Sequence, residues 1–225
     1  KTRKYSYRLI LGPEYFTAAG FLANAKDTNK LRYGIYLDML ATGGILGFSR
    51  SFAGNSYIDK AIKNVLTHKL KSYIDVPYRQ LYGNDEMFYD GPSFNIPMIC
   101  LARKDSDKRP LHHRSTDNLE NCNFDQLEEA LNVLKNLVDI FEKDFIPVKK
   151  YKGPLYLSRY NLYIDPEKDP KGYSALQAIQ ILMDKKKSCL EIASELDIDF
   201  EFVYRFATAL LKNKLTTKID YIARS

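Results

Sequence analysis

Three polar side chains stand at the ends of apolar segments, where folding could bring them together. Glu14 follows the apolar run in "LILGPEYF", Asp38 ends the strand-like "YGIYLD", and His113 lies in the polar stretch "LHHRSTDNL". Two carboxylates and an imidazole form the mixed oxygen and nitrogen ligand set that Zn²⁺ accepts in proteins. If the three segments meet at one edge of a sheet, these residues could bind a metal ion.

Each of these residues also has an ordinary structural interpretation. A glutamate in the first turn of a helix is stabilised by the helix dipole, which could explain Glu14. Asp38 comes shortly before "ATGG", which favours a turn that the aspartate could cap. His113 could be a solvated loop residue, and His68 could lie on the surface of a helix. Residue types and spacing alone leave both interpretations open.

The elements around these residues predict an α/β fold. Strand patterns alternate with helical ones, which is typical of a three-layer sandwich with a mostly parallel mixed sheet. Strands are expected at Tyr5–Leu11, at Tyr33–Leu37, in "GILGFS" and in "IPMICLA". Helices are expected at Tyr15–Asn24, in "NSYIDKAIKNVLTHKL" and in "FDQLEEALNVLKNLVDIFEKDF". Two long polar loops, "YRQLYGNDEMFYDGPSFN" and "RKDSDKRPLHHRSTDNLENC", adjoin strands, where such folds keep functional residues.

The pattern changes after residue 147. Residues 148–173 are rich in proline, glycine and tyrosine without a helical period, and they are typical of a linker with some extended structure. Residues 174–225 fit three short helices and a β-wing, "KLTTKIDYI"; the helices are expected at Ala175–Met183, Cys189–Leu196 and Phe200–Asn213. We therefore predict an α/β domain of residues 1–147 followed, after the linker, by a small winged helix-turn-helix domain.

The overall charge does not favour a nucleic-acid partner. The chain carries a formal net charge of +6, but its C-terminal segment Lys171–Ser225 has nine basic and seven acidic residues, a net charge of only +2. The third predicted helix of that segment begins among Asp197, Asp199 and Glu201, which have the wrong sign for contact with phosphates. A role in docking, either to another protein or within the same chain, is expected instead.

The remaining composition is that of an ordinary globular protein, with 45% hydrophobic and 28% charged residues. No apolar run approaches the roughly 18 residues of a membrane span. Cys100, Cys122 and Cys189 are odd in number and lack metal or redox spacing, so a reduced, cytoplasmic setting is expected. The chain begins at "KTRKYSYRL" without a methionine, and we expect it to be a fragment or a processed chain.

Three motifs, in order across roughly residues 5–145, resemble the co-catalytic zinc aminopeptidases and glutamate carboxypeptidases. "YLDMLATGG" resembles their strand with a zinc-binding aspartate, and "LHHRSTDNLENCNFDQLEEAL" resembles their last ligand loop. "YGNDEMFYDGPSFNIPMICLA" is similar to the stretch that borders their substrate pocket, which implies substrate contacts for Asp85, Glu86 and Phe88. The opening "YSYRLILGPEYF" resembles a bacterial branch, often named after polysaccharide biosynthesis, that carries an appended winged helix.

This resemblance implies a zinc-dependent metallopeptidase that hydrolyses peptide or amide bonds with water activated by one or two Zn²⁺ ions. It implies Glu14, Asp38 and His113 as metal ligands, with Glu14 alternatively the general base and His112 an alternative ligand. The sequence departs from the family in two ways: Pro13 replaces the first of two adjacent glutamates, and the first two of the five family ligands have no counterpart. This chain alone is therefore not expected to hydrolyse a substrate. A catalytically degenerate binding or scaffold protein, a winged-helix nucleic-acid-binding protein and a homo-oligomer stay open.

Overall fold

The computed structural model describes residues 3–92, 94–104 and 113–221, and it divides them into two compact units. The N-terminal unit comprises residues 5–137, and the C-terminal unit comprises residues 138–221 together with residues 3–4. The boundary therefore falls inside the long helix α4 (Phe124–Lys143), before the boundary after residue 147 that the sequence suggested.

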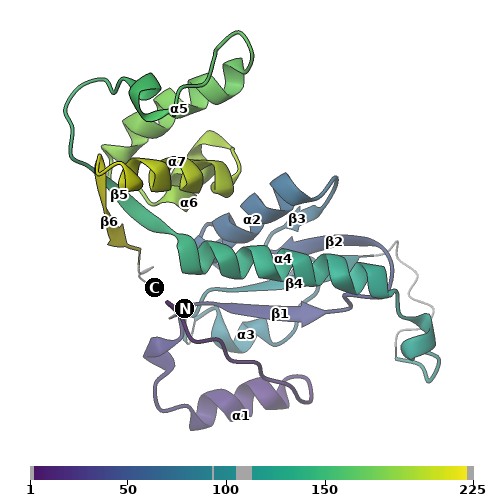
Figure 1. The fold of residues 1–225 in the computed structure, drawn as a ribbon. Helices are drawn as coiled ribbons and strands as arrows, with labels where there is room; N and C mark the ends of the chain where they lie inside the picture. Colours follow the sequence, from purple (N-terminus) through teal and green to yellow (C-terminus); the bar gives the residue numbers. More distant parts are fainter. Residues whose placement is uncertain (1–2, 93, 105–112, 222–225) are drawn as a thin grey trace. The chain divides into compact units, whose positions relative to one another are not determined.

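The N-terminal unit is built on a four-stranded mixed sheet with the strand order β1-β4-β2-β3 (Figure 1). The strands are β1 (Gly34–Asp38), β2 (Ile45–Ser49), β3 (Ile74–Val76) and β4 (Met98–Lys104). β1 pairs parallel to β4 and β2 parallel to β3, while β4 and β2 run antiparallel. Of the seven residues of β4, all but Lys104 are buried, as expected for a central strand covered on both faces.

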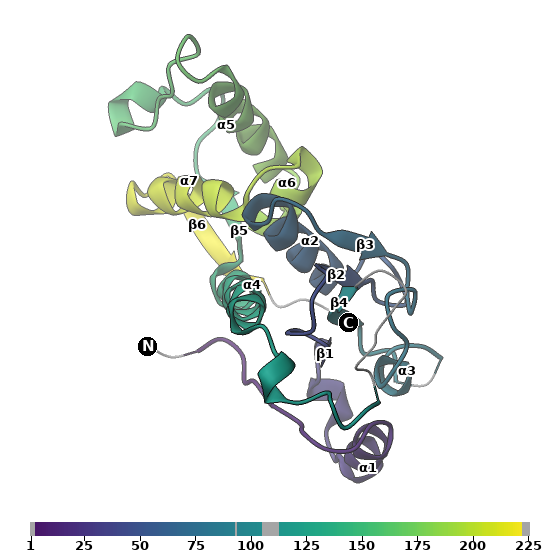
Figure 2. The same cartoon turned by 90° about the vertical axis from the view of Figure 1, so that its right-hand side faces the viewer.

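Helices cover both faces of this sheet. In Figure 2, helix α4 lies on one side of the strands, and α1 (Phe16–Asn24) and α3 (Glu86–Tyr89) lie on the other. Helix α2 (Tyr57–Lys69) packs against β4 and begins with a capping box, in which Ser56 and Asp59 satisfy each other's backbone N–H groups. Two short 3₁₀ helices, Thr28–Lys30 and Leu119–Asn121, complete the unit. The predicted α/β class is confirmed, with a sheet that is mixed and rich in parallel pairs.

One predicted element of this unit is wrong. The sequence predicted a strand at Tyr5–Leu11, but these residues are not part of the described sheet. The alternating pattern describes which side chains prefer burial, whereas a strand also needs a neighbouring strand to accept its hydrogen bonds. The sequence prediction also missed β3 and α3, which are too short to show a period.

The C-terminal unit combines a two-stranded antiparallel ribbon with three helices. The ribbon pairs β5 (Phe145–Lys149) with β6 (Thr216–Asp220). The helices are α5 (Pro170–Met183), α6 (Cys189–Leu196) and α7 (Phe200–Lys212), preceded by a 3₁₀ turn at Leu157–Tyr160. Fully buried apolar residues from all three helices form the core between them, including Ile179, Leu190 and Val203.

Two details of this unit correct the sequence prediction. β5 begins before the predicted linker and overlaps it, so residues 145–149 belong to the ribbon. Helix α5 starts at Pro170 instead of at Ala175. The Asp169 carboxylate accepts a hydrogen bond from the Gly172 N–H at 2.8 Å, and proline is favourable in the first turn. The winged-helix interpretation stays a prediction. Among the described residues, no helix combines the length and apolar character needed to cross a lipid bilayer.

Candidate functional site

Asp38 lies where β1 ends, at the carboxyl edge of the parallel pair β1–β4. It faces Ala102 in the neighbouring strand, and β4 ends two residues later at Lys104. The loop that contains His113 therefore leaves the sheet at the same edge as Asp38. Open α/β sheets place their ligands at this edge, which is where the sequence predicted a site.

The far end of that loop returns to the turn after Asp38. The Asn123 N–H donates to the carbonyl oxygen of Ala41 at 2.9 Å, and the Gly43 N–H donates to Oε1 of Gln126 at 2.9 Å. Gly43 and its neighbour Gly44 both have a positive φ, which explains why this turn uses glycine. The C-terminal end of the loop is thus anchored next to the end of β1.

A buried arginine holds the same turn in place. Arg103 is only 3% exposed, and its Nε donates to the carbonyl oxygen of Leu40 at 2.7 Å. Its Nη2 donates to the carbonyl oxygen of Gln126 at 2.8 Å and to Oε2 of Glu129 at 2.6 Å, and Nη1 reaches the carbonyl oxygen of Gly44 at 3.3 Å. One guanidinium group therefore connects β4, the turn after Asp38 and the start of α4.

Glu14 lies immediately before Tyr15, a residue that contacts the first of the two predicted long loops. The Tyr15 N–H donates to Oδ1 of Asp85 at 2.7 Å, and the ring of Tyr15 packs against that of Phe88 with centroids 6.0 Å apart. These contacts place Glu14 beside Asp85 and Phe88, two of the residues for which substrate contacts were predicted. The side chain of Glu14 itself is exposed.

The carboxylates of the candidate site affect the pKa of Tyr36. Tyr36 stands two residues before Asp38, on the same face of β1. Burial raises the pKa of Tyr36, and the negative charges of Asp38, Glu14 and Asp85 raise it further. Burial and the charges of these carboxylates therefore both favour the neutral form of the Tyr36 phenol.

Three of the nine described non-glycine residues with a positive φ are candidate site residues or follow one directly. Tyr15, directly after Glu14, has φ 61°, and Met39, directly after Asp38, has φ 45°. His113 itself has φ 60°. Residues other than glycine seldom adopt positive φ, and such strain concentrates where a side chain must be held in one direction for function.

The described residues do not by themselves complete a metal site. Carboxylates suit Zn²⁺ and harder divalent cations, so the chemistry of Glu14 and Asp38 is appropriate. Yet the described ranges hold no group of three or more His, Cys, Asp or Glu side chains placed to bind one ion. His113 is exposed, and its convergence with the two carboxylates stays a prediction; His112 lies outside the described residues.

The carboxylate of Glu86 is buried and forms its hydrogen bonds within its own loop. It is 1% exposed, and both of its carboxylate oxygens accept the Asn84 N–H, at 3.0 and 2.8 Å. Nε of Arg79 lies 3.5 Å from Oε1. Burial raises the pKa of Glu86, although the hydrogen bonds and Arg79 oppose that shift. We therefore leave Glu86 out of the proposed substrate contacts, because its carboxylate already serves the loop.

A pH experiment should detect this burial. A carboxyl group whose pKa is raised by folding stabilises the fold below its unfolded pKa, and that contribution is lost as pH rises through the folded value. Glu86→Gln should therefore gain stability relative to the wild type as pH rises from about 4 to 7. Thermal unfolding of both proteins across this range measures the difference, and a constant difference would show that the carboxyl group titrates normally. Glu120→Gln, at an exposed position, serves as the control.

Two residues of this site were not identified from the sequence. Tyr36 could have been found, because alternation along β1 places it on the same face as Asp38. Arg103 left only a weak signal, a single arginine at the end of the apolar "MICLARK". Neither its burial nor its four oxygen partners can be inferred without the fold.

A solved structure shares the fold of this chain. A crystal structure of a candidate peptidase from Clostridium acetobutylicum matches with a TM-score of 0.83 and 23% identity, covering 97% of this chain and 50% of that one. A zinc aminopeptidase from Bacillus subtilis aligns with a TM-score of 0.45 and 14% identity over 56% of this chain and 32% of its own. The fold of the present chain is that of the first of these structures.

Sequence comparison agrees and gives the family. A Clostridium acetobutylicum protein named for polysaccharide biosynthesis and an aminopeptidase-like domain is 25% identical over 217 residues, which are 94% of this chain and 50% of the relative. Residues 1–144 match the family described as "Domain of unknown function (DUF4910)", and the chain belongs to that family. It spans about half the length of the relatives that it matches.

Proposed function

We propose that the full-length protein is a zinc-dependent hydrolase of the aminopeptidase type, and that this chain contributes Glu14, Asp38 and His113 to its centre. The observation that carries the proposal is the position of Asp38 at the carboxyl edge of the parallel pair β1–β4, together with the hydrogen bond that joins Tyr15, the residue after Glu14, to Asp85. The other ligands would come from parts of the full-length protein that these residues do not include.

The proposed roles follow from charge and position. A bound zinc ion would supply an acidic water and polarise a carbonyl group. Glu14 has an exposed side chain, and it would either bind the ion or accept the proton of that water. Asp85 would hold the free α-ammonium group of the substrate, and Phe88 would pack against its side chain. The neutral Tyr36 hydroxyl can donate a hydrogen bond without adding charge to this cluster.

The proposed substrate is a peptide or a small molecule with an amide bond. A carboxylate cluster favours a substrate with a free amino group next to the scissile bond. The name of the Clostridium relative connects that protein with polysaccharide biosynthesis. An amide on a sugar precursor is therefore the second substrate class to test.

The direct experiment uses the full-length protein, purified without chelators. We expect it to release the chromophore from aminoacyl arylamides. Dialysis against a chelator should lower the rate at least about 100-fold, because the metal supplies the nucleophile, and added Zn²⁺ should restore it. Activity that survives complete removal of metal would contradict the zinc assignment.

A non-catalytic binding or scaffold role is the competing proposal. It is favoured by Pro13, which stands where the zinc aminopeptidases that this sequence resembles have the first of two adjacent glutamates. A full-length protein that binds zinc but hydrolyses no amino-terminal or sugar amide would favour this alternative.

For the C-terminal unit we propose a winged helix-turn-helix that docks to protein and not to DNA. Helix α7 is capped by Asp199 and carries Glu201 in its first turn, so negative charge stands where phosphates would approach. Titration of the full-length protein with duplex DNA at about 150 mM salt should give nothing tighter than about 10⁻⁶ M, the range of non-specific binding. A nanomolar complex would reverse this proposal.

A further inference from the structure

The connection between β5 and α5 is long and electropositive. Residues 150–169 contain a single 3₁₀ turn, whereas connections in compact domains usually have about 4–6 residues. Over residues 145–164 the sequence has four basic residues and four tyrosines but no aspartate or glutamate. Lys149 pairs with Asp184 at 2.7 Å, and the other three basic residues have no ion pair within the described part of the chain. Long connections of this kind often carry a function.

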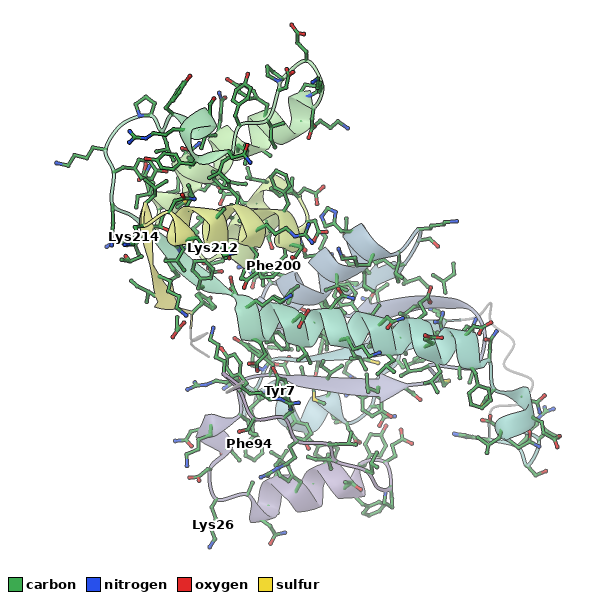
Figure 3. All side chains as sticks on the ribbon, in the orientation of Figure 1. Tyr7, Lys26, Phe94, Phe200, Lys212 and Lys214 are labelled. Carbon is green, nitrogen blue, oxygen red and sulfur yellow. The ribbon has the colours of Figure 1, made fainter. Side chains whose placement is uncertain are left out.

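Two side-chain contacts hold this connection against helix α5. The hydroxyl of Tyr151 donates to Oε1 of Gln180 at 3.4 Å. The ring of Tyr163 packs edge-on against that of Tyr173, with the ring centroids 6.2 Å apart. Figure 3 draws the side chains of the connection beside α5. The connection therefore presents a defined surface to its surroundings.

Between these two contacts, a turn brings an arginine and several tyrosines together. The Arg159 N–H donates to the carbonyl oxygen of Tyr156 at 3.2 Å. The guanidinium carbon of Arg159 lies 6.0 Å from the centre of the Tyr160 ring. Tyr156 is 75% exposed and Tyr163 53%, and Arg159 is exposed as well. We call residues 156–163 the tyrosine–arginine turn.

These residue types define what the turn can bind. A guanidinium group binds a carboxylate through two parallel hydrogen bonds, and contact with an aromatic ring restricts the directions in which it points. Exposed tyrosines offer large apolar faces that lose little conformational entropy on binding, and tyrosine and arginine are enriched where protein interfaces gain most of their energy. We infer that the tyrosine–arginine turn is a docking site for an acidic segment of another protein.

The charges of the C-terminal unit favour a polypeptide over a nucleic acid as the partner. A single-stranded nucleic acid needs a basic groove that follows several successive phosphates. The tyrosine–arginine turn has only Arg159, and helix α7 of the same unit begins with the acidic Asp199 and Glu201. The inference rests on the proposed docking role of this unit, and it adds the surface and the charge of the partner.

Peptide selection on the full-length protein tests the inference. The probe is a library of random short peptides displayed on phage, which requires no known partner. We expect the selected peptides to be enriched in aspartate and glutamate next to apolar residues. They should bind Arg159→Gln at least about 10-fold more weakly than the wild type, because both hydrogen bonds to a carboxylate are lost. Arg159→Lys keeps the charge without the two parallel hydrogen bonds, and it should also lose most of the binding.

Arg205→Gln is the matched control. The side chain of Arg205 is 78% exposed and already pairs with Glu201 at 2.9 Å. We expect this change to leave peptide binding within about 2-fold of the wild type, because exposed ion pairs contribute little. Similar losses in Arg205→Gln and Arg159→Gln would show that binding depends only on the overall charge, and they would overturn the inference.

Three further results would also overturn it, and they separate this surface from the docking role of the unit. Selected peptides without acidic enrichment would contradict the charge of the partner. Acidic peptides that bind the wild type and Arg159→Gln equally would support the docking role but place it on another surface. A single-stranded thymidine oligonucleotide that binds more tightly than the selected peptides would assign the turn to nucleic acid.

Discussion

Asp38→Ala in the full-length protein is expected to remove most amide hydrolysis, by about 100-fold or more, and to lower the bound zinc. The physical reason is position. Asp38 ends β1 at the carboxyl edge of the sheet, and the next residue, Met39, has φ 45°. A carboxylate at this edge can bind an ion or orient a water molecule. Hydrolysis rates and zinc content by elemental analysis, compared with the wild type, measure the effect.

The alternative role of Asp38 as a turn residue predicts a different result. Loss of a capping carboxylate costs about 1 kcal/mol of stability and leaves metal content unchanged. Asp27→Ala is the matched control, because Asp27 is 59% exposed and pairs with Lys30 on the surface. Equal zinc in the wild type and in Asp38→Ala would reject the ligand assignment, even if activity fell.

Arg103→Met is expected to cost about 2–4 kcal/mol of unfolding free energy. Methionine keeps much of the buried side-chain volume but removes every hydrogen bond of the guanidinium group. The carbonyl oxygens of Leu40 and Gln126 would lose their donor, and each buried acceptor left without a partner costs about 1–3 kcal/mol. Chemical denaturation of the variant measures the loss.

The same variant should also lower activity, because the turn after Asp38 would lose its support. Lys104→Met is the control: Lys104 is the next residue along β4, and it is exposed. A stable Arg103→Met protein with normal activity would show that the turn does not depend on the guanidinium group. A destabilised protein with normal activity per folded molecule would limit Arg103 to a structural role.

Sequence patterns predicted most helices and strands whose apolar period lies within one segment. The helical periods of "NSYIDKAIKNVLTHKL" and "FDQLEEALNVLKNLVDIFEKDF" correspond to α2 and α4, because an amphipathic face repeats within one segment. Helix α6 begins at Cys189, where the sequence predicted it, and Ser188 and Glu191 form a capping box at that start. The α/β class followed from the alternation of such segments. The sequence also selected Glu14 and Asp38 as candidates, because each follows a segment that was expected to be a strand.

Contacts between distant segments were decided only by the tertiary structure. The strand pattern of Tyr5–Leu11 was not enough to make a strand, since pairing needs a neighbour that the described sheet does not provide. β5 and β6 lie far apart in the sequence and acquire their ribbon only through each other. The hydrogen bonds of buried Arg103 and the bond from the Tyr15 N–H to Asp85 likewise join residues from separate elements. Side-chain patterns report what each segment prefers to bury, but hydrogen-bond partners and local electric fields depend on which segments the fold brings together.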